Sequence, residues 1–110
     1  MPAIRVAEFL DSSGRSPFGR WFEDLEATAA AKISAALYRL AQSNFSNVKG
    51  VGSGVFEYRI DFGPGYRIYF GKDGATVVIL LGGGTKKRQS RDIEAAAEAW
   101  ADYKRRKPAR

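Results

Sequence analysis

The stretch VFEYRIDFGPGYRIYF, from Val55 to Phe70, predicts two β-strands joined by a tight turn. Apolar and polar residues alternate on both sides of GPG, with the period of two that is typical of strands. In the first strand, Glu57 and Arg59 lie on the face opposite the aromatic residues. In the second, Arg67 and Tyr69 share one face. Arg59 and Arg67 are therefore neighbours on one side of the sheet if the strand register allows it.

The segments that follow continue the sheet and end in a helix. The Asp-Gly dipeptide within residues 71–74 predicts a hairpin turn. Residues 75–81, ATVVILL, are apolar throughout, which predicts a central strand covered on much of both faces. Three glycines end this strand, and a run of cations comes next. A last helix is expected next, with Ser90 or Asp92 as its N-cap.

The N-terminal part predicts a short edge strand and a long helical segment. Residues 4–9 are partly β-branched and aromatic and precede a turn-rich stretch. Ser16 and Pro17 form a helix start, and apolar residues recur at helical spacing as far as residues 43–44. An unbroken helix of this span would be about 39 Å long. We therefore expect a kink or a helical hairpin near residues 27–30, and a loop over residues 44–54.

The order of predicted elements indicates the fold class. It reads β-α(α)-β-β-β-α, and the short turns between consecutive strands favour antiparallel pairing. We expect an α+β fold in which the helices cover one face of a small, mostly antiparallel, four-stranded sheet, while the other face stays partly polar. The chain of 110 residues fits one domain, residues 1–110, with a basic tail from about Lys104.

Composition limits the chemistry that this chain can perform. It has no cysteine and no histidine, which excludes thiolate chemistry, Cys-His zinc sites and Ser-His-Asp triads. No metal or other cofactor is expected. No stretch approaches the ~20 apolar residues of a membrane span, and we find no signal-peptide pattern, so we expect a cytoplasmic protein without a membrane partner. The net charge of +6 favours a polyanionic partner such as nucleic acid, or an acidic protein, although a merely soluble basic surface explains it as well.

The facing arginines are the strongest candidates for an anion site. Like charges opposite each other in a sheet repel, so Arg59 and Arg67 indicate a carboxylate neighbour or an anionic ligand. Glu57 and Asp61 flank Arg59, and salt bridging is their expected role rather than glycosidase-type catalysis. The segment GGGTKKRQS, residues 82–90, lacks the spacing of a phosphate-binding P-loop. A solvated patch is the default interpretation of its cations.

Several of these segments resemble one family of proteins. VFEYRIDFGPGYRIYF, followed by VVILLGGGTKKRQSRDI, resembles the RelE/ParE superfamily of bacterial toxins, and most closely its HigB-like branch of addiction module killer proteins. FGRWFEDL, before the long helical segment, fits that branch too. The resemblance covers Phe18 to about Trp100. It implies a RelE-like fold, a toxin of a type II toxin–antitoxin system, and a cognate helix-turn-helix antitoxin encoded by a neighbouring gene.

The resemblance also implies an activity. Many RelE-type members cut messenger RNA on the translating ribosome, so the implied function is a ribosome-dependent endoribonuclease with ribosome and mRNA as partners. In those members basic residues hold the scissile phosphate, and the ribose 2′-hydroxyl attacks the phosphorus. Arg67 matches the arginine of the family's YR strand, and Lys86 matches a basic residue after the last strand. The predicted catalytic residues are Arg67, Lys86, Arg59 and Glu57, and the last two are placed by the alternation of faces along their strand. The predicted RNA-binding residues are Tyr69, Lys87, Arg88, Gln89 and Arg91.

One departure from the family pattern leaves alternatives open. The tyrosine that some members carry early in the last helix has no counterpart, because Asp92 or Ile93 falls there. Proton transfer would then depend on a lysine whose pKa is lowered by neighbouring cations, or on Glu57 as a base. The alternatives are a ParE-like inhibitor of DNA gyrase without nuclease activity, and a basic binding module for nucleic acid or protein.

Overall fold

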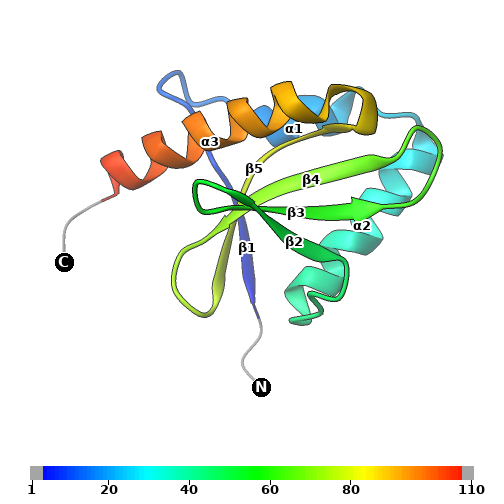
Figure 1. Cartoon of the computed structure of the whole chain (residues 1–110), viewed down its shortest axis with the longest axis horizontal. Helices are drawn as coiled ribbons and strands as arrows, with labels where there is room; N and C mark the ends of the chain where they lie inside the picture. The colour runs from blue at the N-terminus through cyan, green and yellow to red at the C-terminus, as the bar shows by residue number, and fades with distance from the viewer. Residues whose placement is uncertain (1–3, 108–110) are drawn as a thin grey trace.

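The computed structural model describes residues 4–107, which form one five-stranded sheet and three α-helices (Figure 1). The strands are β1 (Arg5–Glu8), β2 (Val48–Gly52), β3 (Val55–Ile60), β4 (Tyr66–Lys72) and β5 (Val77–Thr85). The helices are α1 (Pro17–Glu23), α2 (Ala27–Ala41) and α3 (Gln89–Arg106), and a single turn of 3-10 helix, Lys86–Arg88, joins β5 to α3. The predicted α+β class is confirmed.

The sheet contains one strand more than the sequence predicts. Its order is β1-β5-β4-β3-β2, with β1 parallel to β5 and every other neighbour antiparallel. The additional strand is β2, in the segment that was expected to be a loop. Glycines are depleted in strands, so VKGVG carries little strand signal of its own. Its pairing with β3, which places Lys49 opposite Glu57, makes it a strand.

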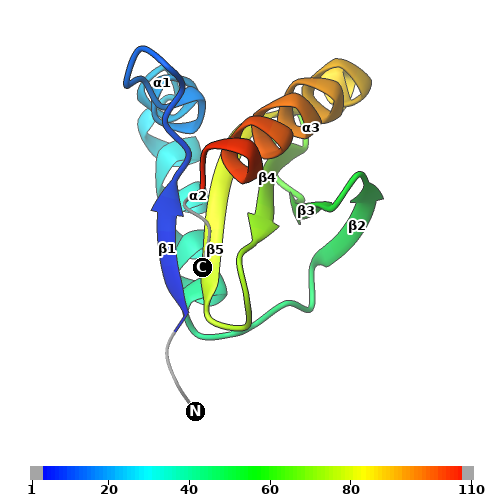
Figure 2. The ribbon, with the colours of Figure 1, turned by 90° about the vertical axis from the view of Figure 1, so that its left-hand side faces the viewer.

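Helices cover both faces of the sheet, so the prediction of a single covered face is wrong. Residues of α1 and α2 pack in one core cluster, and residues of α3 pack in a second cluster on the other face. In Figure 2, α3 crosses in front of the sheet and α2 lies behind it. Alternate residues of β5 divide between the clusters, with Leu80 in the first and Leu81 in the second. The uniformly apolar sequence of β5 therefore reflects burial on both faces, as predicted.

Small residues let α3 approach the sheet closely. The ring of Trp100, on α3, packs above Gly71, where an added Cβ would lie 2.5 Å from the ring. Any larger residue at Gly71 would push the helix away from β4. The indole also stacks on Tyr103, with ring centroids 5.3 Å apart. The fit of this large ring over Gly71 thus holds α3 close to the sheet.

The N-terminal helical segment is a hairpin of two helices, as expected. Ser16 is the N-cap of α1, and its hydroxyl oxygen accepts a hydrogen bond from the Gly19 N–H at 2.9 Å. The break between α1 and α2 spans residues 24–26, slightly before the predicted 27–30. The buried residues of α2 recur at intervals of three and four, which is the pattern of a helix with one apolar face; they are Ala29, Ile33, Ala36 and Leu40.

The C-terminal helix begins earlier and ends later than the sequence predicts. It starts at Gln89 with Arg88 as its N-cap, so neither Ser90 nor Asp92 caps it. Lys104, Arg105 and Arg106 form its last turn, so the predicted basic tail is partly helical; residues 108–110 of that tail lie outside the described residues. No helix within residues 4–107 is long and apolar enough to cross a membrane.

The register of β3 and β4 agrees with the sequence pattern. Arg59 lies directly opposite Arg67, and Glu57 lies opposite Tyr69. The turn between these strands contains Gly63 and Gly65, both with positive φ, of 55° and 78°. Glycine adopts this conformation without steric cost. The GPG segment thus sets the register that places the two arginines side by side.

Candidate functional site

A cleft of about 480 Å³ lies at the end of the sheet formed by β2, β3 and β4. Four cationic side chains line it: Lys49, Arg59, Arg67 and Lys86. Asp61 is the one carboxylate among its lining residues; the remainder are Ser46, Asn47, Val48 and Gly65. The backbone N–H of Lys86 donates to the Gly65 carbonyl at 2.8 Å, which fixes the start of the 3-10 turn beside the β3–β4 turn.

A buried carboxylate holds the two facing arginines in place. Glu57 is completely buried, and its Oε1 lies 3.6 Å from the Nε of Arg59 while its Oε2 lies 3.8 Å from the Nε of Arg67. Arg59 is half exposed, whereas the side chain of Arg67 is only 4 % exposed and forms the floor of the cleft. The expected carboxylate neighbour is therefore present, and it offsets the repulsion between the arginines.

Neither of these two ion pairs is close enough to be a hydrogen bond. As a result Oε1 of Glu57 and Nε of Arg67 have no hydrogen-bond partner although both atoms are buried. The Nη1 of Arg67 makes one long bond, at 3.4 Å, to the Tyr66 carbonyl. Buried polar atoms are rarely left unpaired in folded proteins. Of these two atoms only the Nε of Arg67 is a donor, and it is buried beside Glu57, so the floor of the cleft acts on an anion through the positive charge of Arg67.

Gln89 connects the cleft to α3. Its Nε2 donates to Oε2 of Glu57 at 2.7 Å, so the first residue of the helix holds the carboxylate from above. Gln89 was predicted to contact RNA, but in this structure its amide contacts Glu57. It positions the charge that in turn positions both arginines.

Two of the predicted site residues are buried away from solvent. Tyr69 and Glu57 are both fully buried, so a direct contact of either side chain with RNA does not fit this structure. Burial, followed by the negative charges of Glu57 and Asp92, raises the pKa of Tyr69 far above its ordinary value. Tyr69 is therefore a neutral phenol at physiological pH. Sequence alternation assigned both residues to the correct face but did not reveal that α3 covers it.

Asp92 lies under α3 against Gly84 of β5, because that strand runs through the three glycines that were expected to end it. A side chain at Gly84 would overlap its carboxyl group, and its buried Oδ2 has no hydrogen-bond partner. Burial raises the pKa of the Asp92 carboxyl, and the nearby Arg88 and Arg91 only partly oppose this shift. Asp92 falls near the place of the family tyrosine, but its carboxyl group faces the sheet rather than the cleft.

The raised pKa of Asp92 leads to a prediction about stability. The folded protein holds this proton more tightly than the unfolded chain does, so ionisation of Asp92 lowers stability as the pH rises above its ordinary pKa of 3.8. We expect Asp92→Asn to raise the melting temperature at pH 7 by on the order of a few degrees. The gain should shrink as the pH falls below 3.8, where Asp92 becomes protonated in both states.

Thermal melts across this pH range measure the effect. Glu94→Gln, an exposed site on the same helix, removes the same charge and serves as the control. A gain for Asp92→Asn that is equal at both ends of the pH range would contradict the assigned burial effect.

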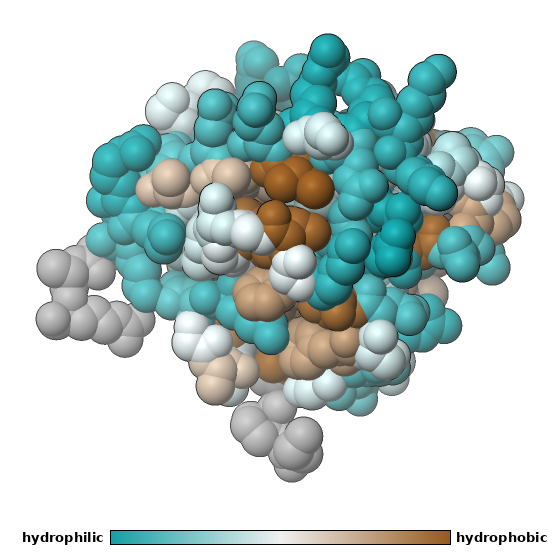
Figure 3. All heavy atoms as spheres, viewed as in Figure 1, coloured by the Kyte–Doolittle hydropathy of each residue, from teal (hydrophilic) through white to brown (hydrophobic). Residues whose placement is uncertain are grey.

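The other predicted RNA-binding cations surround the cleft without lining it. Lys87, Arg88 and Arg91 are exposed on the 3-10 turn and the first turn of α3. Figure 3 shows hydrophilic side chains along the upper rim of the molecule, over α3. These cations extend the positive surface beyond the cleft, as a long polyanion would require.

The sequence interpretation missed two charged residues of the cleft. Lys49 was assigned to a loop, although the β-branched residues Val48 and Val51 on either side of it were a weak signal of the strand that carries it. Asp61 was placed on the correct face but considered only as a salt-bridge partner. Both enter the cleft because β2 pairs with β3, a contact between separate segments that local sequence does not specify.

This arrangement is suited to binding a phosphate group. The planar guanidinium of arginine can donate two parallel hydrogen bonds to a phosphate and stays charged at all physiological pH values. Among residues 4–107, no group of three His, Cys, Asp or Glu side chains lies close enough to hold a metal ion.

Comparison with known proteins agrees with the geometry. Residues 20–104 match the family described as "Phage derived protein Gp49-like (DUF891)". A Haemophilus influenzae protein, described only as uncharacterized, is 45% identical over 80 residues, which are 72% of this chain and 81% of that protein. The solved structure of an arginine-to-alanine double mutant of the E. coli toxin RelE in the free state is similar, with a TM-score of 0.65 at 16% identity, covering 87% of this chain and 96% of that one. The chain therefore belongs to the Gp49-like family, a family of RelE-like toxins within the RelE/ParE superfamily.

Proposed function

We propose that this protein is the toxin of a toxin–antitoxin system and acts as a ribosome-dependent endoribonuclease that cleaves mRNA. The observation that carries the proposal is the cationic cleft, in which Arg59 and Arg67 face each other across two strands and share one buried carboxylate. Family membership supports the toxin assignment. The cleft supports an anionic substrate, because four cations line it against one exposed carboxylate.

The two arginines are the proposed phosphate ligands. Arg59 is exposed enough to contact the scissile phosphate directly, and the nearly buried Arg67 adds its positive charge from the floor of the cleft. Lys86 adds positive charge at the rim, where charge accumulates on the phosphorane in the transition state. Because Glu57 and Gln89 hold the arginines before substrate arrives, little reorganisation is needed during the reaction.

Proton transfer is assigned to residues that reach the cleft. Asp61 accepts the proton of the ribose 2′-hydroxyl, and the 2′-oxygen then forms its bond to phosphorus. The bond from phosphorus to the 5′-oxygen breaks, and Lys86 supplies a proton to that leaving oxygen. The products are a 2′,3′-cyclic phosphate and a 5′-hydroxyl end. Buried Glu57 is reassigned from base to positioning residue, and the ribosome orients the RNA for in-line attack.

A toxin of this kind requires an antitoxin in the cell that produces it. The net charge of +6 favours an acidic partner and rapid encounter with it. We propose that this partner is a helix-turn-helix protein encoded by the adjacent gene.

Expression in bacteria, with mapping of RNA ends and of plasmid supercoiling, tests the proposed function. We expect growth arrest, at least about a tenfold rise in mRNA fragments with 5′-hydroxyl ends in coding regions, and unchanged supercoiling. Co-expression of the adjacent gene should restore growth. Arrest without new RNA ends but with altered supercoiling would support a gyrase inhibitor instead. Absence of arrest would support a binding module.

A further inference from the structure

An apolar groove lies on the side of the molecule away from the cationic cleft. The sheet order places β1 at one edge and β2, which borders the cleft, at the other. The groove has a volume of about 650 Å³ and runs between β1 and the helices α1 and α2. Val6 of β1, Phe18 of α1 and Leu37 of α2 contribute to its walls. This surface is therefore separate from the proposed active site.

The most exposed large apolar side chains of the described chain meet at this groove. Leu10 is 51% exposed and Tyr38 is 68% exposed, and no other large hydrophobic residue within residues 4–107 is comparably exposed. Both line the same groove, one from the end of β1 and the other from α2. Scattered exposed hydrophobic residues are ordinary, but two of them on the walls of one apolar groove indicate a contact surface.

The backbone of β1 is open along the same groove. The N–H groups of Arg5 and Phe9 donate to carbonyls of residues 76 and 80, at 2.8 and 2.9 Å. Alternate residues of a strand point their backbone groups to opposite sides, so those of Val6 and Glu8 point away from β5. Figure 2 shows no strand beyond β1 on that side. The middle of β1 is thus an unpaired strand edge.

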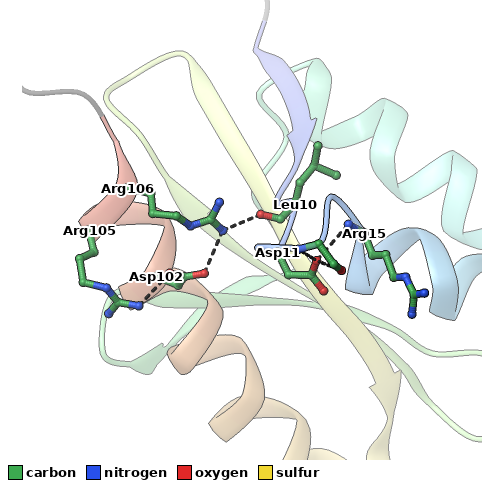
Figure 4. Close-up of polar contacts among 7 residues, drawn as sticks. Leu10, Asp11, Arg15, Asp102, Arg105 and Arg106 are labelled. Carbon is green, nitrogen blue, oxygen red and sulfur yellow. Dashed lines mark hydrogen bonds and ion pairs between the residues drawn. The ribbon is translucent and has the colours of Figure 1, made fainter.

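The two ends of this edge are already covered. The Ile4 N–H donates to the Ala41 carbonyl at the end of α2, at 3.1 Å. At the other end, Nη2 of Arg106 donates to the Leu10 carbonyl at 2.6 Å and to Asp102 at 2.8 Å (Figure 4). Between these contacts the backbone groups of Val6 and Glu8 remain open, which is enough for a short segment of a partner.

Cations outnumber carboxylates around the end of the groove near Glu8. Arg15 and Arg20 share an adjoining hollow with Glu8 and Glu23, and Arg106 and Lys107 share a second hollow with Glu8 and Leu10. A second copy of this chain would bring another net charge of +6 to the surface, which disfavours self-association. An acidic segment complements these arginines.

We propose that the edge of β1 and this groove bind an extended segment of the antitoxin. The segment pairs with the open backbone groups of Val6 and Glu8, places apolar side chains between Leu10 and Tyr38, and directs acidic residues toward the flanking arginines. The proposal rests on the proposed function for the identity of the partner. Because the groove and the cleft lie at opposite edges of the sheet, loss of this contact frees the toxin without harming its active site.

Substitutions on the surface of the groove test the apolar contact. The probe is the purified product of the adjacent gene. Leu10→Glu combined with Tyr38→Glu should weaken its binding at least 100-fold, while growth arrest in its absence is unchanged. Co-expression of that gene should no longer rescue growth of the variant. Ala95→Glu combined with Ala101→Glu adds the same two charges at exposed positions of α3 and should bind like the original protein.

A matched pair at Glu8 tests the strand edge. Glu8→Pro removes one outward-facing N–H, which an edge strand tolerates, and should weaken binding at least tenfold. Glu8→Ala removes the side chain but keeps the N–H and should bind at least as tightly as the original protein. Hydrogen exchange at the amides of Val6 and Glu8 should slow on complex formation.

Three results would overturn the proposal, and each has a different consequence for the toxin–antitoxin assignment. If the adjacent gene product binds tightly but the amides of Val6 and Glu8 are not protected from hydrogen exchange, the proposed docking surface is wrong and the toxin–antitoxin assignment stands. Protection of these amides in the isolated protein, with a dimeric mass, would assign the edge to self-association. Absence of any binding or rescue by the adjacent gene product would overturn the toxin–antitoxin assignment and this surface together.

Discussion

The double variant Arg59→Ala/Lys86→Ala should lose growth arrest and RNA cleavage almost completely. Both side chains are exposed and line the cleft, so their removal leaves the proposed phosphate site with Lys49 and the nearly buried Arg67. Removing one preorganised charge-stabilising donor typically costs about 10²–10³ in rate, so we expect a loss of at least about 10³ for two. Counts of RNA 5′-hydroxyl ends and colony survival measure it.

The matched control is Lys87→Ala/Arg88→Ala. It removes the same charge from exposed residues immediately next to the cleft that do not line it. We expect this variant to arrest growth nearly as well as the original protein, because surface cations outside the site contribute mainly long-range attraction. Equal loss in both variants would show that only total charge matters, and would remove the cleft as the site of cleavage. Melting temperatures of both should stay within a few degrees of the original value.

Arg67→Met should strongly destabilise the fold as well as abolish activity. Arg67 is nearly buried, and its loss leaves the fully buried Glu57 with only the half-exposed Arg59 as a cationic neighbour. Breaking a buried ion pair by removing one partner costs about 3–5 kcal/mol, because a charge is left uncompensated in the interior. For a domain of this size, the melting temperature should fall by on the order of 15 °C. Chemical denaturation measures the change in free energy of unfolding.

The double variant Glu57→Gln/Arg67→Met separates charge from packing. It removes both charges and preserves side chains of similar volume, so we expect it to recover most of the lost stability. It should remain inactive, because Arg67 is a proposed phosphate ligand. If Arg67→Met alone proves as stable as the original protein, Glu57 does not depend on Arg67, and the proposed positioning role of that carboxylate fails.

Local patterns predicted much of the candidate site. Alternation in β3 and β4 assigned Glu57, Arg59 and Arg67 to one face, and the GPG turn set a register in which the two arginines pair. These features depend on residues close in the sequence, where side-chain period and turn geometry fix the outcome. The resemblance to RelE-like toxins added Lys86, which lines the same cleft.

Burial of the site could not be predicted in the same way. The sequence placed the arginines on an open polar face, whereas α3 covers much of that face. Gln89 reaches Glu57 across 32 positions in the chain, and Trp100 fits over Gly71 across 29. A single sequence does not state which helix face meets which glycine, because that depends on the simultaneous packing of both layers.

The sequence by itself determined the α+β class, the hairpin that pairs Arg59 with Arg67, and the double-sided burial of β5. Periodicity and turn chemistry are local properties, and they are sufficient for each of these. Tertiary structure alone decided that β2 is a strand, that α3 lies on the opposite face from α1 and α2, and that Glu57 is buried beneath Gln89. Each of these results depends on contacts between distant segments, and such contacts form only when the whole chain packs into one core.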